Sequence, residues 1–85
     1  MSDVLDAVSP DSRAVIVEEL AHRNPALLAE LRGTQEPTTD QREAVERLLA
    51  VALIKNLGPD QVPNEHGLAI ERAINAFLEV WPIYR

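Results

Sequence analysis

The sequence predicts an all-α fold, a small bundle of about four helices, and two observations lead to that prediction. Apolar residues recur at the three- and four-residue spacing of a helix in successive segments, whereas no segment alternates with period two over a useful length. Capping residues, glycine and proline separate these segments. The 85 residues suffice for a single domain, 1–85, and leave no room for a second core. In chain order, the expected elements are a turn or arm over 1–8, helices over 10–23, 25–32, 39–57 and 65–81, and a tail over 82–85.

The first two helices each begin with a capping residue followed by proline. Ser9-Pro10 and Asn24-Pro25 place proline at the first helical position. An N–H at that position has no partner within the helix, so its absence in proline costs no hydrogen bond. Gly33 supplies a C-terminal stop for the second helix. The preceding arm has three apolar residues that can fold back over the bundle, Val4, Leu5 and Val8. The polar side of the first helix, expected to face water, carries Glu18, Glu19, His22 and Arg23.

The third helix is the longest and the most apolar. Thr38 and Gln41 have the spacing of a capping box at its start. Its main apolar stripe consists of Val45, Leu48, Leu49, Ala52 and Leu53. The run 48–54 contains no polar residue, so Val51 and Ile54 give the helix a second apolar side. A helix that is apolar nearly all round is normally buried nearly all round, and we therefore expect a long, largely buried third helix.

The fourth helix has the most regular apolar stripe in the chain. Asn64 is expected to cap it, and Trp81-Pro82 to end it, because a residue before proline resists the helical conformation. Phe77 lies on the stripe and is assigned to the core. Gly67, in the first turn, indicates a close approach of another helix or loop.

Composition narrows the classes of function. Fourteen acidic against eight basic side chains give a net charge of −6, which disfavours nucleic acid because its binders cluster Lys and Arg. A helix-turn-helix over the first two helices is disfavoured as well, since the second offers only Glu30 and Arg32 as charged groups. No apolar run reaches the roughly 18 residues of a membrane span, so no membrane partner is expected. The acidic start without a signal sequence predicts a cytoplasmic location, and the preference for Arg over Lys suggests a high-G+C bacterial source.

No residue pattern predicts catalysis, a metal or a cofactor. Glu18 and His22 stand four apart, but a metal site needs further ligands, and the other histidine, His66, lies in a different cap region. The chain has no cysteine. Its serines near the N-terminus lack the Gly-x-Ser-x-Gly turn that presents a nucleophile. We therefore expect a protein that is not an enzyme.

The surplus apolar side of the third helix has two explanations, which the sequence leaves open. Either the other helices surround this helix, or the surplus forms a patch of the kind that marks an interface. The second explanation predicts a small acidic helical protein that acts through contacts with a protein partner or with itself as a homodimer. An alternative is an inhibitor or antitoxin-like protein whose acidic surface covers a basic site. The candidate interface residues are Val51, Ile54, Leu57, Trp81, Tyr84 and Arg85.

Overall fold

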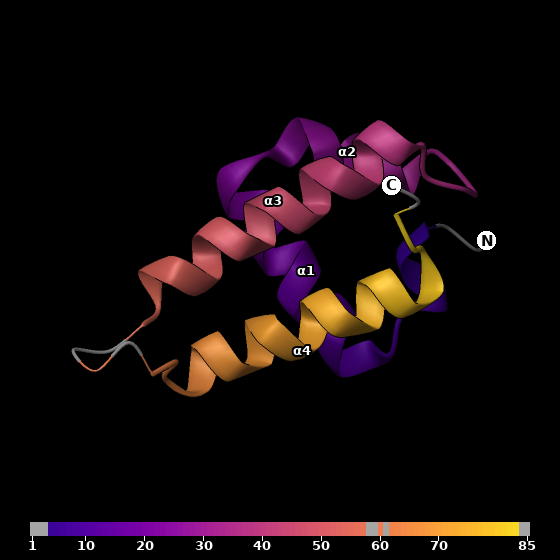
Figure 1. The fold of residues 1–85 in the computed structure, drawn as a ribbon. Coiled ribbons are helices and arrows are strands. Elements are labelled where there is room, and N and C mark those ends of the chain that lie inside the picture. The colour runs from indigo at the N-terminus through magenta and orange to yellow at the C-terminus, as the bar shows by residue number, and fades with distance from the viewer. Residues whose placement is uncertain (1–3, 58–59, 61, 84–85) are drawn as a thin grey trace.

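The computed structural model describes residues 4–57, 60 and 62–83. The regular elements in this part of the chain are all helices (Figure 1). One isolated β-bridge joins Leu57 and Pro63. The elements are a 3₁₀ turn, η1 (Val4–Ala7), followed by α1 (Pro10–Arg23), α2 (Pro25–Arg32), α3 (Thr39–Lys55) and α4 (Glu65–Val80). The all-α prediction is confirmed. None of the helices in the described residues combines the length and the apolar character that crossing a membrane requires.

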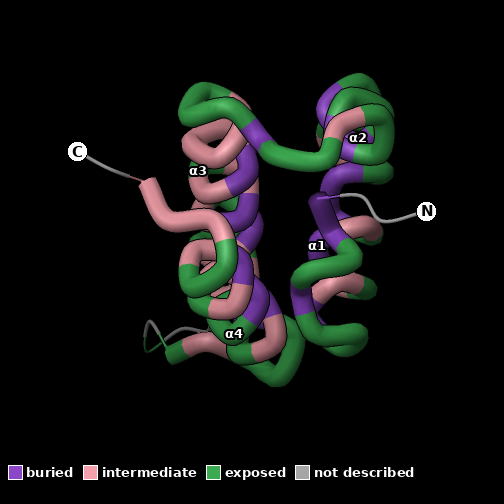
Figure 2. The backbone as a smooth tube through the Cα atoms, turned by 90° about the vertical axis from the view of Figure 1, so that its right-hand side faces the viewer, coloured by how far each residue is buried: buried purple, intermediate pink, exposed green. Residues whose placement is uncertain are grey.

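The helices form two layers. One layer is the antiparallel pair α3 and α4, and the other is α1 with α2 (Figure 2). Helix α1 packs against both α3 and α4, whereas α2 packs against α1 and η1. The loop end of the α3–α4 pair extends beyond α1 and α2, along the molecule's longest dimension of 41 Å (Figure 1). The last turns of α3 are therefore less covered than its first turns.

The core lies between the two layers. Phe77 is fully buried, as expected for the stripe of α4. The turn η1 folds back over the bundle as predicted, because Val4, Leu5 and Val8 are each at most 2% exposed. The other buried apolar side chains are Ile16, Leu20, Leu27, Leu28, Leu31, Val45, Leu49, Ala52, Ile70 and Ala73.

Local hydrogen bonds fix the helix starts. The capping box of α3 is present, since Gln41 N donates to Thr38 Oγ1 at 3.1 Å and Thr38 N donates to Gln41 Oε1 at 2.9 Å. The Asn24 and Asn64 side chains accept backbone N–H bonds at the starts of α2 and α4. Ser9 stands at the cap of α1 but its side chain makes no capping bond, so that start depends on proline at the first position.

Helix α3 ends at Lys55, two residues before the predicted end. The Asn56 side chain turns back and donates to the Ala52 carbonyl at 2.7 Å, and the Asn56 carbonyl accepts from Asn64 N at 3.1 Å. The Gly67 prediction is confirmed, because a Cβ there would lie 2.9 Å from Pro63 Cβ. The end of α3 and the start of α4 are thus joined by the backbone bond from Asn64 to Asn56 and by the Leu57–Pro63 bridge.

Within this single chain, α3 is buried along one face. Val45, Leu49 and Ala52 are fully buried, whereas Val51 is 41% and Ile54 66% exposed. The expectation of a largely buried third helix is therefore not confirmed in the isolated chain. The explanation in which the other helices surround α3 on all sides does not hold for its last turns.

Candidate interaction surface

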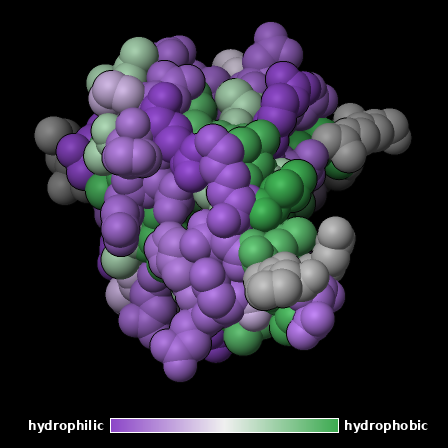
Figure 3. Space-filling model, turned by 90° about the vertical axis from the view of Figure 1, so that its left-hand side faces the viewer, coloured by the Kyte–Doolittle hydropathy of each residue, from purple (hydrophilic) through white to green (hydrophobic). Residues whose placement is uncertain are grey.

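The outward face of α3 carries an exposed aliphatic pair between two cations. Arg47, Val51 and Lys55 are spaced four residues apart and share one face of the helix, with Ile54 beside them. Arg47 and Lys55 are exposed, and neither forms an ion pair among the described residues. We name these four residues the α3 patch. Figure 3 views the loop end of the molecule, where hydrophobic side chains gather on one side and polar side chains cover most of the rest.

A shallow groove adjoins the α3 patch on the side of the α1–α2 corner. Its volume is about 330 Å³ and it opens to solvent. Its lining residues are Arg23, Asn24, Ala44, Arg47, Leu48 and Val51, and we name it the Arg23–Arg47 groove. The lining thus combines aliphatic side chains with two arginines. Such a surface can bind a chain that offers apolar side chains together with carboxylates.

The structure adds three exposed aliphatic residues that sequence reasoning did not identify as exposed. Val62, in the loop before α4, is 62% exposed, and Leu68, on the outer side of α4, is 45% exposed. Val80, at the end of α4, was assigned to its apolar stripe but is 37% exposed. Leu68 lies off the apolar stripe of its helix, which is the signal that could have identified it. Leu57, a predicted interface residue, is instead half-buried and pairs with Pro63. Its backbone belongs to the turn that closes the α3–α4 pair.

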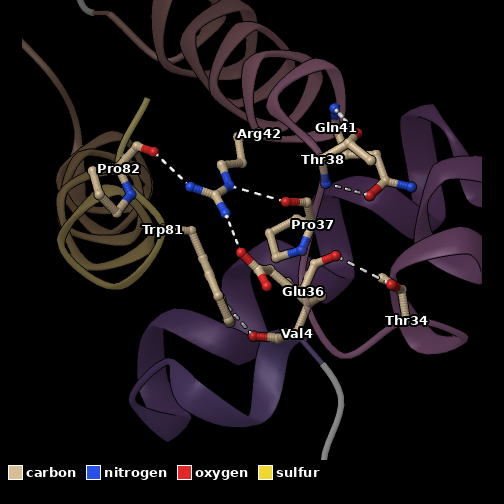
Figure 4. Close-up of polar contacts among 9 residues, drawn as sticks. All are labelled: Val4, Thr34, Glu36, Pro37, Thr38, Gln41, Arg42, Trp81 and Pro82. Carbon is tan, nitrogen blue, oxygen red and sulfur yellow. Dashed lines mark hydrogen bonds and ion pairs between the residues drawn. The ribbon is translucent and has the colours of Figure 1, made fainter. Parts of the chain in front are cut away.

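Trp81, another predicted interface residue, has a clear structural role. Its ring is half-buried against the core, and its Nε1–H donates to the Val4 carbonyl at 3.0 Å (Figure 4). The Arg42 guanidinium lies over the ring, 5.5 Å from its centroid, as in a cation–π contact. The remaining predicted interface residues, Tyr84 and Arg85, lie outside the described residues.

Arg42 joins three segments at this end of the bundle. It donates to the Pro82 carbonyl at 2.8 Å and the Pro37 carbonyl at 3.1 Å, and it reaches Glu36 Oε1 at 3.4 Å (Figure 4). Its side chain is only 11% exposed. These bonds connect the start of α3 with the preceding linker and with the segment after α4. Sequence reasoning did not identify this role, because the Pro82 partner is 40 residues away.

Glu19 lies in a second polar cluster, between α1 and α4. It was expected to face water, which is wrong, since it is only 7% exposed. His66, in the first turn of α4, lies against it with Nε2 2.9 Å from Glu19 Oε1, and Arg23 Nε donates to Glu19 Oε2 at 2.9 Å. Burial of Glu19 raises the pKa of its carboxyl, but the hydrogen bonds from His66 and Arg23 outweigh burial and leave the pKa below its ordinary value.

The Glu19 carboxylate finds its hydrogen-bond partners within the chain. Its carboxylate oxygens both have partners, and the described residues contain no group of three His, Cys, Asp or Glu side chains placed to hold a metal. Through the bond to its Nε, the cluster holds Arg23, which also lines the Arg23–Arg47 groove. It therefore links the packing of α1 and α4 to the candidate surface.

A third feature is a groove of about 390 Å³ between the start of α1 and α4. Ser9, Asp11, Ser12 and Arg72 are its polar lining residues. The described lining includes no histidine that could activate a serine. The Asp11 carboxylate also opposes the binding of an anion there. The evidence for a function is consequently weaker at this groove than at the α3 patch.

Comparisons with protein families, with characterised proteins and with solved structures found no match to this chain. Any function must be argued from the surfaces described above.

Proposed function

We propose that this protein is a non-catalytic interaction module that binds a protein partner through the α3 patch and the adjoining Arg23–Arg47 groove. The observation that carries the proposal is the exposure of Val51 and Ile54, 41% and 66%, on a helix whose opposite face is packed into the bundle. Scattered apolar residues are common on protein surfaces, but adjacent aliphatic residues beside an apolar groove are typical of interfaces. The bundle supplies a rigid support for them, because α3 is anchored by Val45, Leu49 and Ala52.

A homodimer is the form of this proposal in which the partner is a second copy of the chain. Two-fold dimers are the commonest closed assemblies of soluble proteins, and each copy would cover the other's aliphatic pair. The inhibitor-like alternative requires a concentrated acidic face. The α3 patch carries Arg47 and Lys55 instead and therefore does not support it.

The experiment uses Val51→Glu and Ile54→Glu in the full chain, with Leu68→Glu as the matched control. The exposed fraction of Leu68, 45%, is similar to the 41% of Val51, but Leu68 lies on the outer side of α4. Light scattering over a dilution series measures self-association, and capture from cells of the source organism measures other partners. Association that is lost in the α3 variants and kept in the control supports the proposal. A monomer whose captured partners are the same with and without Val51→Glu contradicts it.

A further inference from the structure

Both charged side chains that line the Arg23–Arg47 groove are arginines, of which Arg23 is ion-paired with Glu19 and Arg47 forms no ion pair among the described residues. The chain carries a net charge of −6, yet the six described lining residues of the groove include two arginines and no carboxylate. Lys55 continues the positive charge along α3. A surface with this local charge attracts negative groups although the protein as a whole repels them.

Arg23 is held in position for such a contact. Its Nε donates to the buried Glu19 carboxylate at 2.9 Å, so the direction of the guanidinium group is fixed from within the bundle. The bond uses Nε alone, and its side chain remains 24% exposed. A guanidinium fixed in this way loses less conformational entropy when a carboxylate binds its outer edge.

The spacing of the patch fits a helix. Arg47, Val51 and Lys55 extend along α3 over about 12 Å, the rise of eight helical residues, or about two turns of a partner helix lying alongside. An amphipathic helix places aliphatic side chains at i, i+3, i+4 and i+7 in an apolar groove. Leu48 and Val51 would contact those side chains, and carboxylates at the flanking positions would face the cations.

A second copy of the chain fits this surface less well. In a two-fold dimer centred on Val51, the Arg47 and Lys55 side chains of each copy would approach those of the other, and like charges at an interface oppose association. We infer that the Arg23–Arg47 groove binds an acidic amphipathic helix of a different protein, with its aliphatic side chains against Leu48 and Val51 and its carboxylates facing Arg23 and Arg47. This inference rests on the proposed function and specifies its partner.

The test titrates the isotope-labelled full chain with two synthetic helical peptides at low ionic strength, followed by amide chemical shifts. Both peptides carry leucine at i, i+3, i+4 and i+7. One has glutamate at the flanking positions, and the other has lysine. We expect the glutamate peptide to bind more tightly and to shift the amides of Ala44, Leu48 and Val51. Arg47→Glu should weaken its binding about fivefold or more, whereas Arg72→Glu, a control at an exposed position of α4, should leave binding within about twofold.

Four results would overturn the inference. The first is equal or tighter binding of the lysine peptide, and the second is shifts confined to another surface. The others are no binding of either peptide and dimerisation through Val51 that blocks the groove. The proposed function survives these results if Val51→Glu still abolishes an association that Leu68→Glu preserves. Whatever the peptides do, the proposed function is contradicted if no association of the chain responds to Val51→Glu or Ile54→Glu.

Discussion

Glu19→Gln should destabilise the fold while preserving the shape of the side chain. The carboxylate lies 2.9 Å from both Arg23 Nε and His66 Nε2, and it is only 7% exposed. Hydrogen bonds to charged groups contribute about 1.5–3 kcal/mol each, but glutamine retains one acceptor and both partners are partly exposed. We therefore expect a loss of about 1–2 kcal/mol at neutral pH, equivalent to about 4–16 °C in the melting temperature of a domain of this size.

The effect should depend on pH in a defined direction. Because the folded-state pKa of Glu19 is below its ordinary value of 4.5, the unfolded chain binds more protons at this residue as pH falls past that value. The contribution of the Glu19 carboxylate is therefore fully present above pH 4.5 and is lost as pH falls through the lower folded-state pKa. Glutamine resembles the protonated side chain, so wild type and variant should converge in acid.

Thermal unfolding followed by far-UV circular dichroism, at neutral pH and in acid, measures both parts of this prediction. Glu18→Gln is the matched control, because Glu18 is the exposed neighbour in the same helix. A Glu19→Gln protein as stable as the control at neutral pH would refute the reasoning. A stability difference that stayed constant into acid would show that its cause is not the ionised carboxylate.

Two further variants test the close contacts of the fold, both by urea unfolding. Gly67→Ala should destabilise by about 1–2 kcal/mol although alanine favours helix, because the added Cβ would lie 2.9 Å from the Pro63 ring; Gly33→Ala, where the nearest atom is 3.6 Å away, should be nearly neutral. Equal midpoints for these two variants would contradict the packing argument. Trp81→Phe removes the donor to the Val4 carbonyl and should cost about 1–2 kcal/mol, so an unchanged midpoint would show that this bond contributes nothing.

The features that sequence reasoning predicted correctly depend on neighbours in the chain. The Thr38–Gln41 capping box and the Asn64 cap need only residues three positions apart, and such pairs can be read directly from spacing. The burial of Phe77 follows from helical periodicity in the same way. These signals sufficed for the all-α class and for the approximate bounds of the helices.

What the sequence could not predict depends on how the helices cross. Glu19 belongs to the polar side of its own helix, and its burial depends on the packing of α4, which brings His66, 47 residues later, against it. The bonds from Arg42 to Pro82 likewise need the start of α3 to lie beside the end of α4. For the α3 patch, periodicity indicated surplus apolar surface around Val51 but could not decide whether another helix covers it. The structure decides this for the single chain, because α1 and α2 stop short of the loop end of α3.

The bond from Trp81 to Val4 has a consequence for biosynthesis. It joins residues 77 positions apart, so the cover of the turn η1 is complete only when the segment after α4 has been made. Helices α1 and α2 contact η1 earlier in synthesis, and they can hold Val4 and its apolar neighbours before α4 arrives. We therefore expect α1, α2 and η1 to associate first and the addition of α4 with Trp81 to fix their packing.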